Sequence, residues 1–373
     1  MRKFVIGLLV VAFLVSAIGV VGTAAPAYKI GIVTGTVSQG EDEYRGAEKM
    51  KAKYGDMIKH VIYPDNFMQE QETTIAQITG LAADPDVKAI VVNQAVPGTV
   101  AAIRQVREIR PDIIFLLGVP HEDPELVSDT ADLSFETDQE RRGVTIVQLA
   151  KELGAEKFLH YSFPRHMAMP LLAKRADIMK EEAERLGIEF IFATAPDPMG
   201  EYGIPGAQQF ILEDVPRQVE KYGKNIALFS TNCSMQEPLI ISALNTGAIF
   251  PEQCCPSPTH GYPAALGLEI TDEMKGNIPA ILKAINDAIV EKGGAGRFAT
   301  WPVPTNYLLV EACVEIARDT IEGKMELSDL DAVKARLEAA AGVPMELRRL
   351  PEKPDGNFYL LTSGSVVFGR DEF

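Results

Sequence analysis

The chain has 373 residues, of which 46% are hydrophobic and 24% are charged, and its formal net charge is -16. This balance excludes a disordered or low-complexity protein, and the length predicts about two domains of roughly 100–200 residues each. A surface this acidic repels phosphate backbones, so we expect no nucleic-acid partner. Four cysteines are too few for a disulfide scaffold in a chain of this length.

Residues 1–27 have the pattern of a secretory signal peptide. Two basic residues precede an apolar run over 4–21, and alanines at 25 and 27 suit cleavage after Ala27. The alternative is an uncleaved membrane anchor, although the glycines and the borderline length of this run weaken it as a spanning helix. We therefore predict a mature protein outside the cytoplasm, either periplasmic or extracellular.

Short apolar runs rich in β-branched residues alternate with amphipathic helical patterns along the rest of the chain. The apolar runs predict strands over 29–34, 59–63, 89–93, 113–118, 157–161, 189–193 and 225–230. The helical patterns cover 41–54, 70–83, 97–109, 139–153, 167–186, 206–222, 235–246 and 305–322. Strands alternating with helices of this length predict an α/β fold with doubly wound parallel sheets.

Two later segments differ in composition from the rest. Proline, cysteine and glycine gather over 251–265 and again over 293–306, which we interpret as linkers or crossovers. Trp301, beside two prolines, forms either a hinge or cleft wall or an anchor for the last predicted helix, and we favour the anchor. The tail 344–373 is predicted to be a loop followed by a short hairpin turning at 355–357.

The sequence lacks the motifs of the common nucleotide-binding and hydrolytic enzymes. No G-x-G-x-x-G follows the first strand, and the chain contains no P-loop, no G-x-S-x-G elbow and no H-E-x-x-H. The five histidines match no standard zinc spacing. We therefore expect no cofactor and no metal site.

The cysteines leave two readings open. Cys254 and Cys255 are adjacent and unsuited to bond each other, but either can bridge Cys233 in a compartment that permits disulfides. The alternative is that Cys233, Cys254, Cys255 and Cys313 are buried free thiols. A cysteine nucleophile would need a positioned base, for which His260 is the nearby candidate.

Ligands of open α/β sheets bind outside the carboxyl ends of the strands, where helix N-termini point outward. The loops that follow the predicted strands supply hydroxyl, amide, imidazole, guanidinium and aromatic groups, as a small polar ligand requires. The candidate ligand-binding residues are Thr36, Ser38, Gln39, Asn66, Phe67, Asn93, Gln94, His121, Asp138, Phe163, Arg165, Asn232 and Ser234.

Several of these residues have a structural alternative. Arg165 pairs either with a carboxylate or phosphate of the ligand or with an acidic residue at the rim of a lobe. Phe67 and Phe163 can hold a ring between them, although core packing is the better interpretation of each alone. Asp138 and Arg142 either touch the ligand or only cap and orient a helix.

Four segments, in order along the chain, carry a resemblance to a known family. They are 28–47, with Glu43-Tyr44-Arg45-Gly46-Ala47 on its helix, 84–94, 138–161 and 227–250. Together they resemble the type I periplasmic binding proteins of the sugar- and nucleoside-binding kind, and most of all an uncharacterised branch, DUF3798. That family often has Asp where this chain has Asn232.

The resemblance implies two lobes joined by three crossovers, with a ligand held in the cleft between them. The domains that we assign are lobe 1 over 28–138 with a returning segment at about 268–300, lobe 2 over 139–267 with a returning segment at about 301–343, and a C-terminal tail over 344–373.

We therefore expect a monomeric solute-binding protein that captures a small polar ligand for an ABC-type permease or a membrane receptor. Binding needs no catalytic group, which agrees with the missing enzyme motifs. One alternative is a secreted, hydrolase-like enzyme on the same scaffold, with His121 or His166 as base. Another is a ligand-sensing partner protein.

Overall fold

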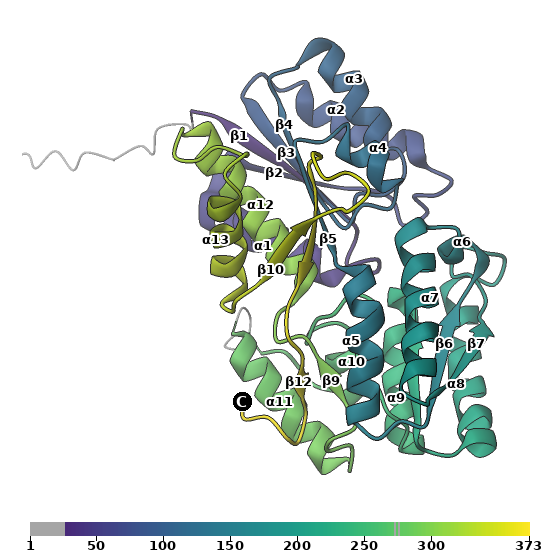
Figure 1. The fold of residues 1–373 in the computed structure, drawn as a ribbon. Helices are drawn as coiled ribbons and strands as arrows, with labels where there is room; N and C mark the ends of the chain where they lie inside the picture. The colour runs from purple at the N-terminus through teal and green to yellow at the C-terminus, as the bar shows by residue number, and fades with distance from the viewer. Residues whose placement is uncertain (1–26, 272–273, 275–276) are drawn as a thin grey trace, which may run out of the picture.

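A computed structural model describes residues 27–373, apart from 272–273 and 275–276. Within these residues the chain forms two lobes, one built on a seven-stranded sheet and the other on a three-stranded sheet (Figure 1). Residues 1–26 of the predicted signal peptide lie outside the described residues. In the described part of the chain, none of the helices has the length and apolar character needed to cross a membrane.

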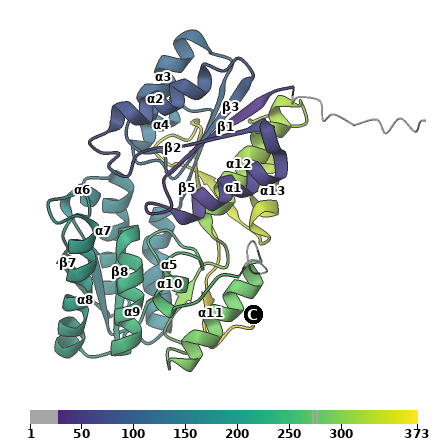
Figure 2. The same ribbon diagram turned by 180° about the vertical axis from the view of Figure 1, so that it is seen from behind.

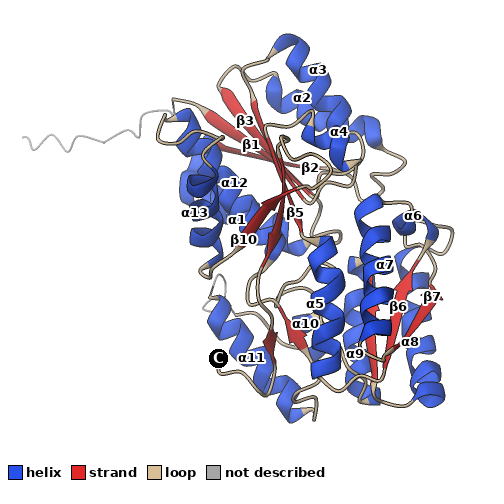
Figure 3. Cartoon of the chain, viewed as in Figure 1, coloured by secondary structure: helices blue, strands red, loops and turns tan. Residues whose placement is uncertain are grey.

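Lobe 1 is a three-layer α/β/α sandwich, in which helices cover both faces of the sheet (Figure 3). Its strands are β1 (Lys29–Thr34), β2 (Ile58–Ile62), β3 (Val87–Asn93), β4 (Ile114–Gly118), β5 (Leu133–Thr137), β10 (Glu346–Arg349) and β11 (Phe358–Thr362). They lie in the order β10-β11-β5-β4-β3-β1-β2, and β10 pairs antiparallel while the other pairs are parallel. The helices are α1 (Glu41–Tyr54), α12 (Thr305–Ile321) and α13 (Leu330–Ala341) on one face, and α2 (Gln71–Ala82), α3 (Thr99–Ile109) and α4 (Pro124–Ser128) on the other, with a 3-10 turn η1 (Gly55–Met57) after α1.

Both faces of this sheet are buried, which explains the continuous apolar runs in its strands. Along β1, Ile30 and Ile32 face the core under α1 and α12, whereas Val33 faces the core under α2 and α3. Because β1 to β5 and β11 run parallel, their carboxyl ends lie at one edge of the sheet.

Lobe 2 is also layered, with helices on both faces of its sheet. Its strands are β6 (Lys157–Ser162), β7 (Glu189–Thr194) and β8 (Ile226–Ser230), in the order β7-β6-β8, together with the short pair β9 (Ala299–Thr300) and β12 (Val366–Val367). One face is covered by α5 (Gln139–Glu152) and α7 (Pro170–Arg185). The other, turned to the viewer in Figure 2, is covered by α8 (Gly203–Tyr222), α9 (Gln236–Thr246), α10 (Tyr262–Leu266) and α11 (Ile278–Glu291). Two short turns, α6 (Pro164–Met167) and η2 (Cys233–Met235), follow β6 and β8.

The chain passes between the lobes three times, as the resemblance implied. The crossings are at Asp138, between β5 and α5, at 301–304, between β9 and α12, and at 363–365, between β11 and β12. We call these three crossing segments the hinge.

The two returning segments belong to the opposite lobes from those predicted, so that assignment was wrong. The helix α11 buries Ile281, Ile285 and Ile289 in the core of lobe 2, whereas α12 and α13 pack into lobe 1. The reason is that residues around Phe250 and Phe298 form parallel bridges that extend the lobe 2 sheet. A helix that connects two neighbouring parallel segments packs on the sheet that contains them.

The C-terminal tail is shared between the lobes rather than standing apart. Its predicted hairpin is present as β10 and β11, and residues 355–357 lie in the connection between them. Because β11 pairs with β5, the hairpin belongs to the sheet of lobe 1, while β12 pairs with β9 in lobe 2. Trp301 is buried in the core of lobe 1 with α12, in agreement with the anchoring interpretation.

Candidate ligand-binding cleft

A cavity of about 930 Å³ lies between the two lobes. It is lined by loops at the carboxyl ends of strands from both lobes, namely 37–39 after β1, Phe67 after β2, Gln94 after β3, 119–121 after β4, 165–166 after β6 and 231–234 after β8. This is where parallel α/β sheets bind ligands, and the volume is within the range of small-molecule sites, roughly 300–1,000 Å³.

Two residues of the cavity wall have a strained backbone. Gln94 and Val119 directly follow β3 and β4, and their φ angles are 50° and 46°. The left-handed region is unfavourable for residues with a Cβ, and most of all for a β-branched residue such as Val119. Strain of this kind gathers at ligand sites, where the surrounding structure holds the backbone in place.

A buried carboxyl group, that of Glu43 on α1, lines the cavity. Its Oε1 accepts a hydrogen bond from Gln94 Nε2 at 2.9 Å, and among the described residues its Oε2 has no partner. Burial raises the pKa of Glu43 to about 8. Near neutral pH this carboxyl group is therefore mostly protonated and can both donate and accept a hydrogen bond.

A second carboxyl group in the wall belongs to Glu136 at the end of β5. Its Oε1 accepts hydrogen bonds from the backbone N–H of Thr137 at 2.7 Å and from Gln139 Nε2 at 2.8 Å. Burial raises the pKa of Glu136 as well. The wall thus carries two carboxyl groups in surroundings that disfavour their charge.

Two imidazoles of the cavity wall are uncharged, and its inner arginine is paired with a carboxylate. Burial lowers the pKa of His121 to about 4 and that of His166 to about 3, so both rings are uncharged at neutral pH. His166 Nδ1 lies 3.0 Å from the hydroxyl of Thr231. Arg165 donates from Nε and Nη2 to both carboxylate oxygens of Asp197, each at 2.9 Å, which is the salt-bridge alternative for this residue.

The structure brings eight of the thirteen candidate residues to the cavity. They are Ser38, Gln39, Phe67, Gln94, His121, Arg165, Asn232 and Ser234. The ring of Phe67 meets the ring of His121 edge to face, with 6.0 Å between their centroids. The two rings give the cavity an aromatic wall beside its polar groups.

The other five candidates are placed elsewhere in the described structure. Two of them, Thr36 and Asn66, stabilise the loops after β1 and β2. The Thr36 hydroxyl donates to Asp65, and the backbone carbonyl of Asn66 accepts from Gln69 and Glu70 at 3.0 and 3.1 Å. Both residues shape the rim through local turns, a role that their position in the sequence does not distinguish from ligand contact.

Asn93 and Phe163 are core residues. Asn93 is fully buried and donates from Nδ2 to the backbone carbonyl of Asn306 at 3.3 Å. Phe163 is 1% exposed, and its ring lies 4.2 Å from that of His166, measured between centroids. Phe163 therefore supports a residue of the cavity rather than the ligand, and the two phenylalanines do not face each other across the described cavity.

Asp138 caps a helix at the first crossing. Its carboxylate accepts from the backbone N–H of Arg141 at 3.0 Å, which satisfies a free donor at the start of α5. It also forms an ion pair with Arg348 of β10. The capping alternative therefore describes Asp138. It is not among the residues that line the described cavity, which corrects the expectation of ligand contact.

Arg142 is a buried structural residue of the hinge. Its Nε lies 2.8 Å from Glu252 Oε1, and both side chains are almost fully buried. The same guanidinium donates to the backbone carbonyls of Gln253 at 2.7 Å and Cys254 at 2.9 Å. Arg142 therefore ties the first crossing to the loop that carries two of the cysteines.

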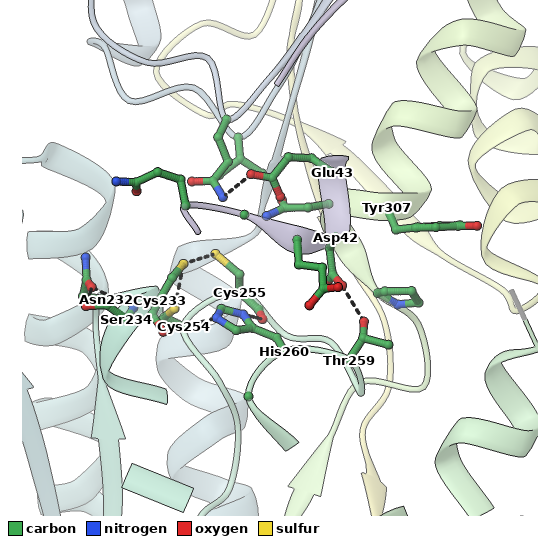
Figure 4. A pocket seen from close by; sticks show the side chains of 18 of the residues that line it. Asp42, Glu43, Asn232, Cys233, Ser234, Cys254, Cys255, Thr259, His260 and Tyr307 are labelled. Atoms are coloured by element: carbon green, nitrogen blue, oxygen red, sulfur yellow. Dashed lines mark hydrogen bonds between the residues drawn. The ribbon is translucent and has the colours of Figure 1, made fainter. Parts of the chain in front are cut away.

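One acidic residue joins the two lobes across the mouth of the cleft. Asp42 of α1, in lobe 1, accepts hydrogen bonds from Ser257 Oγ at 2.6 Å and Thr259 Oγ1 at 2.5 Å, both on the loop before α10. Figure 4 shows the bond between Asp42 and Thr259. We call this set of three residues the Asp42 latch. It holds the lobes together in the structure and did not emerge from the sequence, because its partners are more than 200 residues apart.

Cysteines from two loops gather in the wall formed by lobe 2 (Figure 4). Cys233 Sγ lies 3.5 Å from Cys254 Sγ and 3.7 Å from Cys255 Sγ, and one ligand atom each of Cys233, Cys254 and His260 lie within 4.8 Å of one another. All four cysteines of the chain are free thiols in the structure, and Cys313 is buried on α12. Burial raises the pKa of Cys254 well above its ordinary value, the opposite of what a nucleophilic cysteine needs.

Comparison with known proteins gives the family of the chain. Residues 28–299 match the family described as Protein of unknown function (DUF3798). Two proteins of Treponema pallidum (strain Nichols), both described as uncharacterized, are 37% and 34% identical over 180 and 170 residues. Each alignment covers 46% of this chain, and they cover 81% and 79% of those proteins.

Solved structures of similar shape come from several bacteria. A protein of Clostridium difficile 630 described as a transcriptional regulator has 29% sequence identity and a TM-score of 0.76, covering 91% of this chain and 99% of that one. A sugar ABC transport substrate-binding protein of Bordetella parapertussis 12822 has 13% identity and a TM-score of 0.55, covering 92% and 90%. An ABC transporter periplasmic solute binding protein of Actinobacillus succinogenes 130z, with bound D-allose, has 13% identity and a TM-score of 0.54, covering 80% and 93%. The chain therefore belongs to the DUF3798 family and has the fold of the type I periplasmic binding proteins.

Proposed function

We propose that this protein binds a small, uncharged polar molecule, a sugar or a sugar-like polyol, in the cleft between its lobes. The observation that carries the proposal is the cavity of about 930 Å³, lined by both lobes at the carboxyl ends of their strands. A cavity between two hinged lobes suits capture by closure, in which the lobes surround the ligand.

The electrostatics of the cavity favour a ligand without charge. Glu43 is mostly protonated near neutral pH, and the charge of Arg165 is balanced by Asp197. Charged residues of α1 also line the cavity, but they are engaged in ion pairs, Arg45 with Glu41 and Glu48, and Lys49 with Glu311. A charged ligand would therefore lose its hydration for a site whose charges are already paired. Hydroxyl groups, by contrast, match the amides, hydroxyls and neutral imidazoles of the wall.

The aromatic side of the cavity supports the same ligand class. The edge of Phe67 beside His121 offers an apolar surface, and the opposite wall carries Asn232 and Ser234. Sugars and polyols present hydroxyl groups together with apolar C–H faces. The hydroxyl groups can hydrogen-bond to the polar wall, and the C–H faces can pack against the aromatic wall. Solved proteins of the same fold hold D-allose and myo-inositol, which is consistent with this choice.

We also propose that the protein works outside the cytoplasm and delivers its ligand to an ABC-type transporter. The signal-peptide pattern of residues 1–27 supports the location. The likeness of fold to substrate-binding proteins of sugar transport systems supports the partner.

A ligand-responsive sensor is the second candidate function. It is favoured by the likeness to the Clostridium difficile protein that is described as a transcriptional regulator. The alignment covers 99% of that protein. Deleting the gene separates the two roles, because loss of a transport component abolishes uptake of the labelled ligand, whereas loss of a sensor changes gene expression and leaves uptake intact.

A thermal-shift screen of the purified protein against sugars, polyols, nucleosides, amino acids and carboxylates tests the binding function. A ligand that binds only the folded state, at about 100 times its Kd, adds about 2.7 kcal/mol to stability. We expect an upward shift with sugars or polyols, and recovery of the compound unchanged. A shift with charged compounds alone contradicts the ligand class, and conversion of the compound identifies an enzyme instead.

A further inference from the structure

We propose that Cys233, Cys254 and His260 form a binding site for one thiophilic transition-metal ion, with Zn²⁺ as the reference ion, in the lobe 2 wall of the cleft. The proposal goes beyond ligand binding by the cleft and does not depend on it. Thiolate and imidazole ligands together are those preferred by Zn²⁺ and by Cu(I).

The positions of the sulfur atoms match a metal site more closely than they match a disulfide. In a tetrahedral zinc site the Zn–S bonds are about 2.3 Å, which places two thiolates about 3.8 Å apart. Cys233 Sγ lies 3.5 Å from Cys254 Sγ, and a ring nitrogen of His260 lies within 4.8 Å of both. Small side-chain movements therefore bring all three ligand atoms to bonding distance of one ion.

The imidazole of His260 is oriented as a metal ligand. Its Nδ1 lies 2.9 Å from the backbone carbonyl of Cys255, and its Nε2 lies 3.4 Å from the backbone carbonyl of Cys233. A neutral imidazole carries one N–H, so when Nδ1 donates, the lone pair of Nε2 faces another acceptor. A cation at Nε2 removes this conflict, and a metal-binding histidine typically donates its other N–H to a carbonyl group.

Hydrogen bonds from the surroundings hold the two loops that carry the cysteine ligands. Asn232 accepts from the backbone N–H of Ser234 at 2.9 Å and fixes the turn that carries Cys233, while Arg142 fixes the carbonyl of Cys254.

The site is tested by titrating the reduced, metal-free full-length protein with Co²⁺ under anaerobic conditions and then displacing Co²⁺ with Zn²⁺. We expect one equivalent of Co²⁺ to give the absorption bands of a tetrahedral thiolate site, and Zn²⁺ to bleach them. Cys233→Ser, Cys254→Ser and His260→Gln should each weaken binding by at least about 100-fold. Cys313→Ser, which removes a thiol buried in the other lobe, is the matched control and should leave the affinity unchanged.

Two results would overturn the proposal. One is a wild-type protein with four titratable thiols that gives no saturable Co²⁺ spectrum. The other is an equal loss of affinity in the Cys313→Ser control and in the three ligand variants, because the metal would then bind thiols non-specifically. His260→Gln decides the matter if a cysteine variant does not fold, since it keeps every thiol. The metal titration contains no sugar, so its outcome and that of the ligand screen are independent.

Discussion

At the scale of single residues, the buried carboxyl group of Glu43 connects the stability of the fold to pH. Its pKa is about 8 in the folded state, against about 4.3 in an unfolded chain. The folded state therefore binds the extra proton between these values. Its contribution to stability is fully present below the unfolded pKa and is lost as the pH rises through the folded pKa.

We expect Glu43→Gln to flatten the pH dependence of unfolding between about pH 5 and pH 8, because glutamine has no proton to lose. The slope removed should approach, and not exceed, about 1.4 kcal/mol per pH unit. Urea unfolding across this range measures it. Glu41→Gln, which changes an exposed carboxylate on the same turn of α1, is the control and should keep the wild-type slope. Parallel profiles for wild type and Glu43→Gln would show that Glu43 is ionised in the folded protein.

Two neighbouring arginines at the first crossing offer a second comparison. Arg142 forms a buried ion pair with Glu252, whereas Arg141 pairs with Glu346 at the surface. Removing one partner of a buried pair leaves an uncompensated charge and costs about 3–5 kcal/mol, but loss of a surface pair costs less than about 1 kcal/mol. Arg142→Met should therefore lower the free energy of unfolding far more than Arg141→Met. Similar losses in denaturant unfolding would contradict the structural role of Arg142.

At the scale of elements, α1 contacts lobe 2 through the Asp42 latch. Its hydrogen bonds to Ser257 and Thr259 involve a charged acceptor, for which a contribution of about 1.5–3 kcal/mol is typical. Asp42→Ala should therefore populate an open form, seen as a larger radius of gyration in small-angle X-ray scattering of the ligand-free protein. Asp56→Ala, an exposed change just beyond α1, should leave the radius unchanged. An unchanged radius in Asp42→Ala would show that other contacts close the cleft.

The elements differ in how far the sequence predicts them. The amphipathic period of α1 predicts its limits, 41–54, because one face of this helix is buried. The continuous apolar run of β1 predicts 29–34, because this strand is buried on both faces. The strand β5 is missed because Ser134 and Glu136 interrupt its apolar pattern, although both are buried. The returning segment of about 268–300, which contains α11, is assigned to the wrong lobe because sequence order does not reveal which sheet a returning segment covers.

The sequence predicts only some of the residues that line the cavity. The rule that loops after parallel strands form the site finds Gln94 and His121. It does not separate them from Asn93, whose side chain is directed into the core one residue earlier. The proposed metal site and the Asp42 latch could be predicted only if the position of the loop over 251–261 were known. That position depends on long-range contacts that the sequence does not show.

At the scale of the whole molecule, the two lobes are joined by the hinge, the latch and further contacts outside the cavity (Figure 1). Lys174 of α7 pairs with Glu352 of lobe 1, and Leu171 packs against the lobe 1 core. Under the proposed function the same cavity would serve both ligand capture and closure, since its walls belong to both lobes. A ligand that bridges the walls stabilises the closed form by its greater affinity for it.

Calorimetric titration of the strongest compound of the thermal-shift screen tests this account most directly. Wild-type protein should bind one equivalent, and His121→Phe should weaken binding by at least about tenfold, because it removes the polar atoms of a cavity residue and keeps an aromatic ring. His160→Phe is the matched control, since His160 is buried among the aromatic rings of the lobe 2 core. It should retain the wild-type affinity. Absence of saturable binding, or the same affinity in the wild type and in both variants, would contradict a ligand site in the cleft.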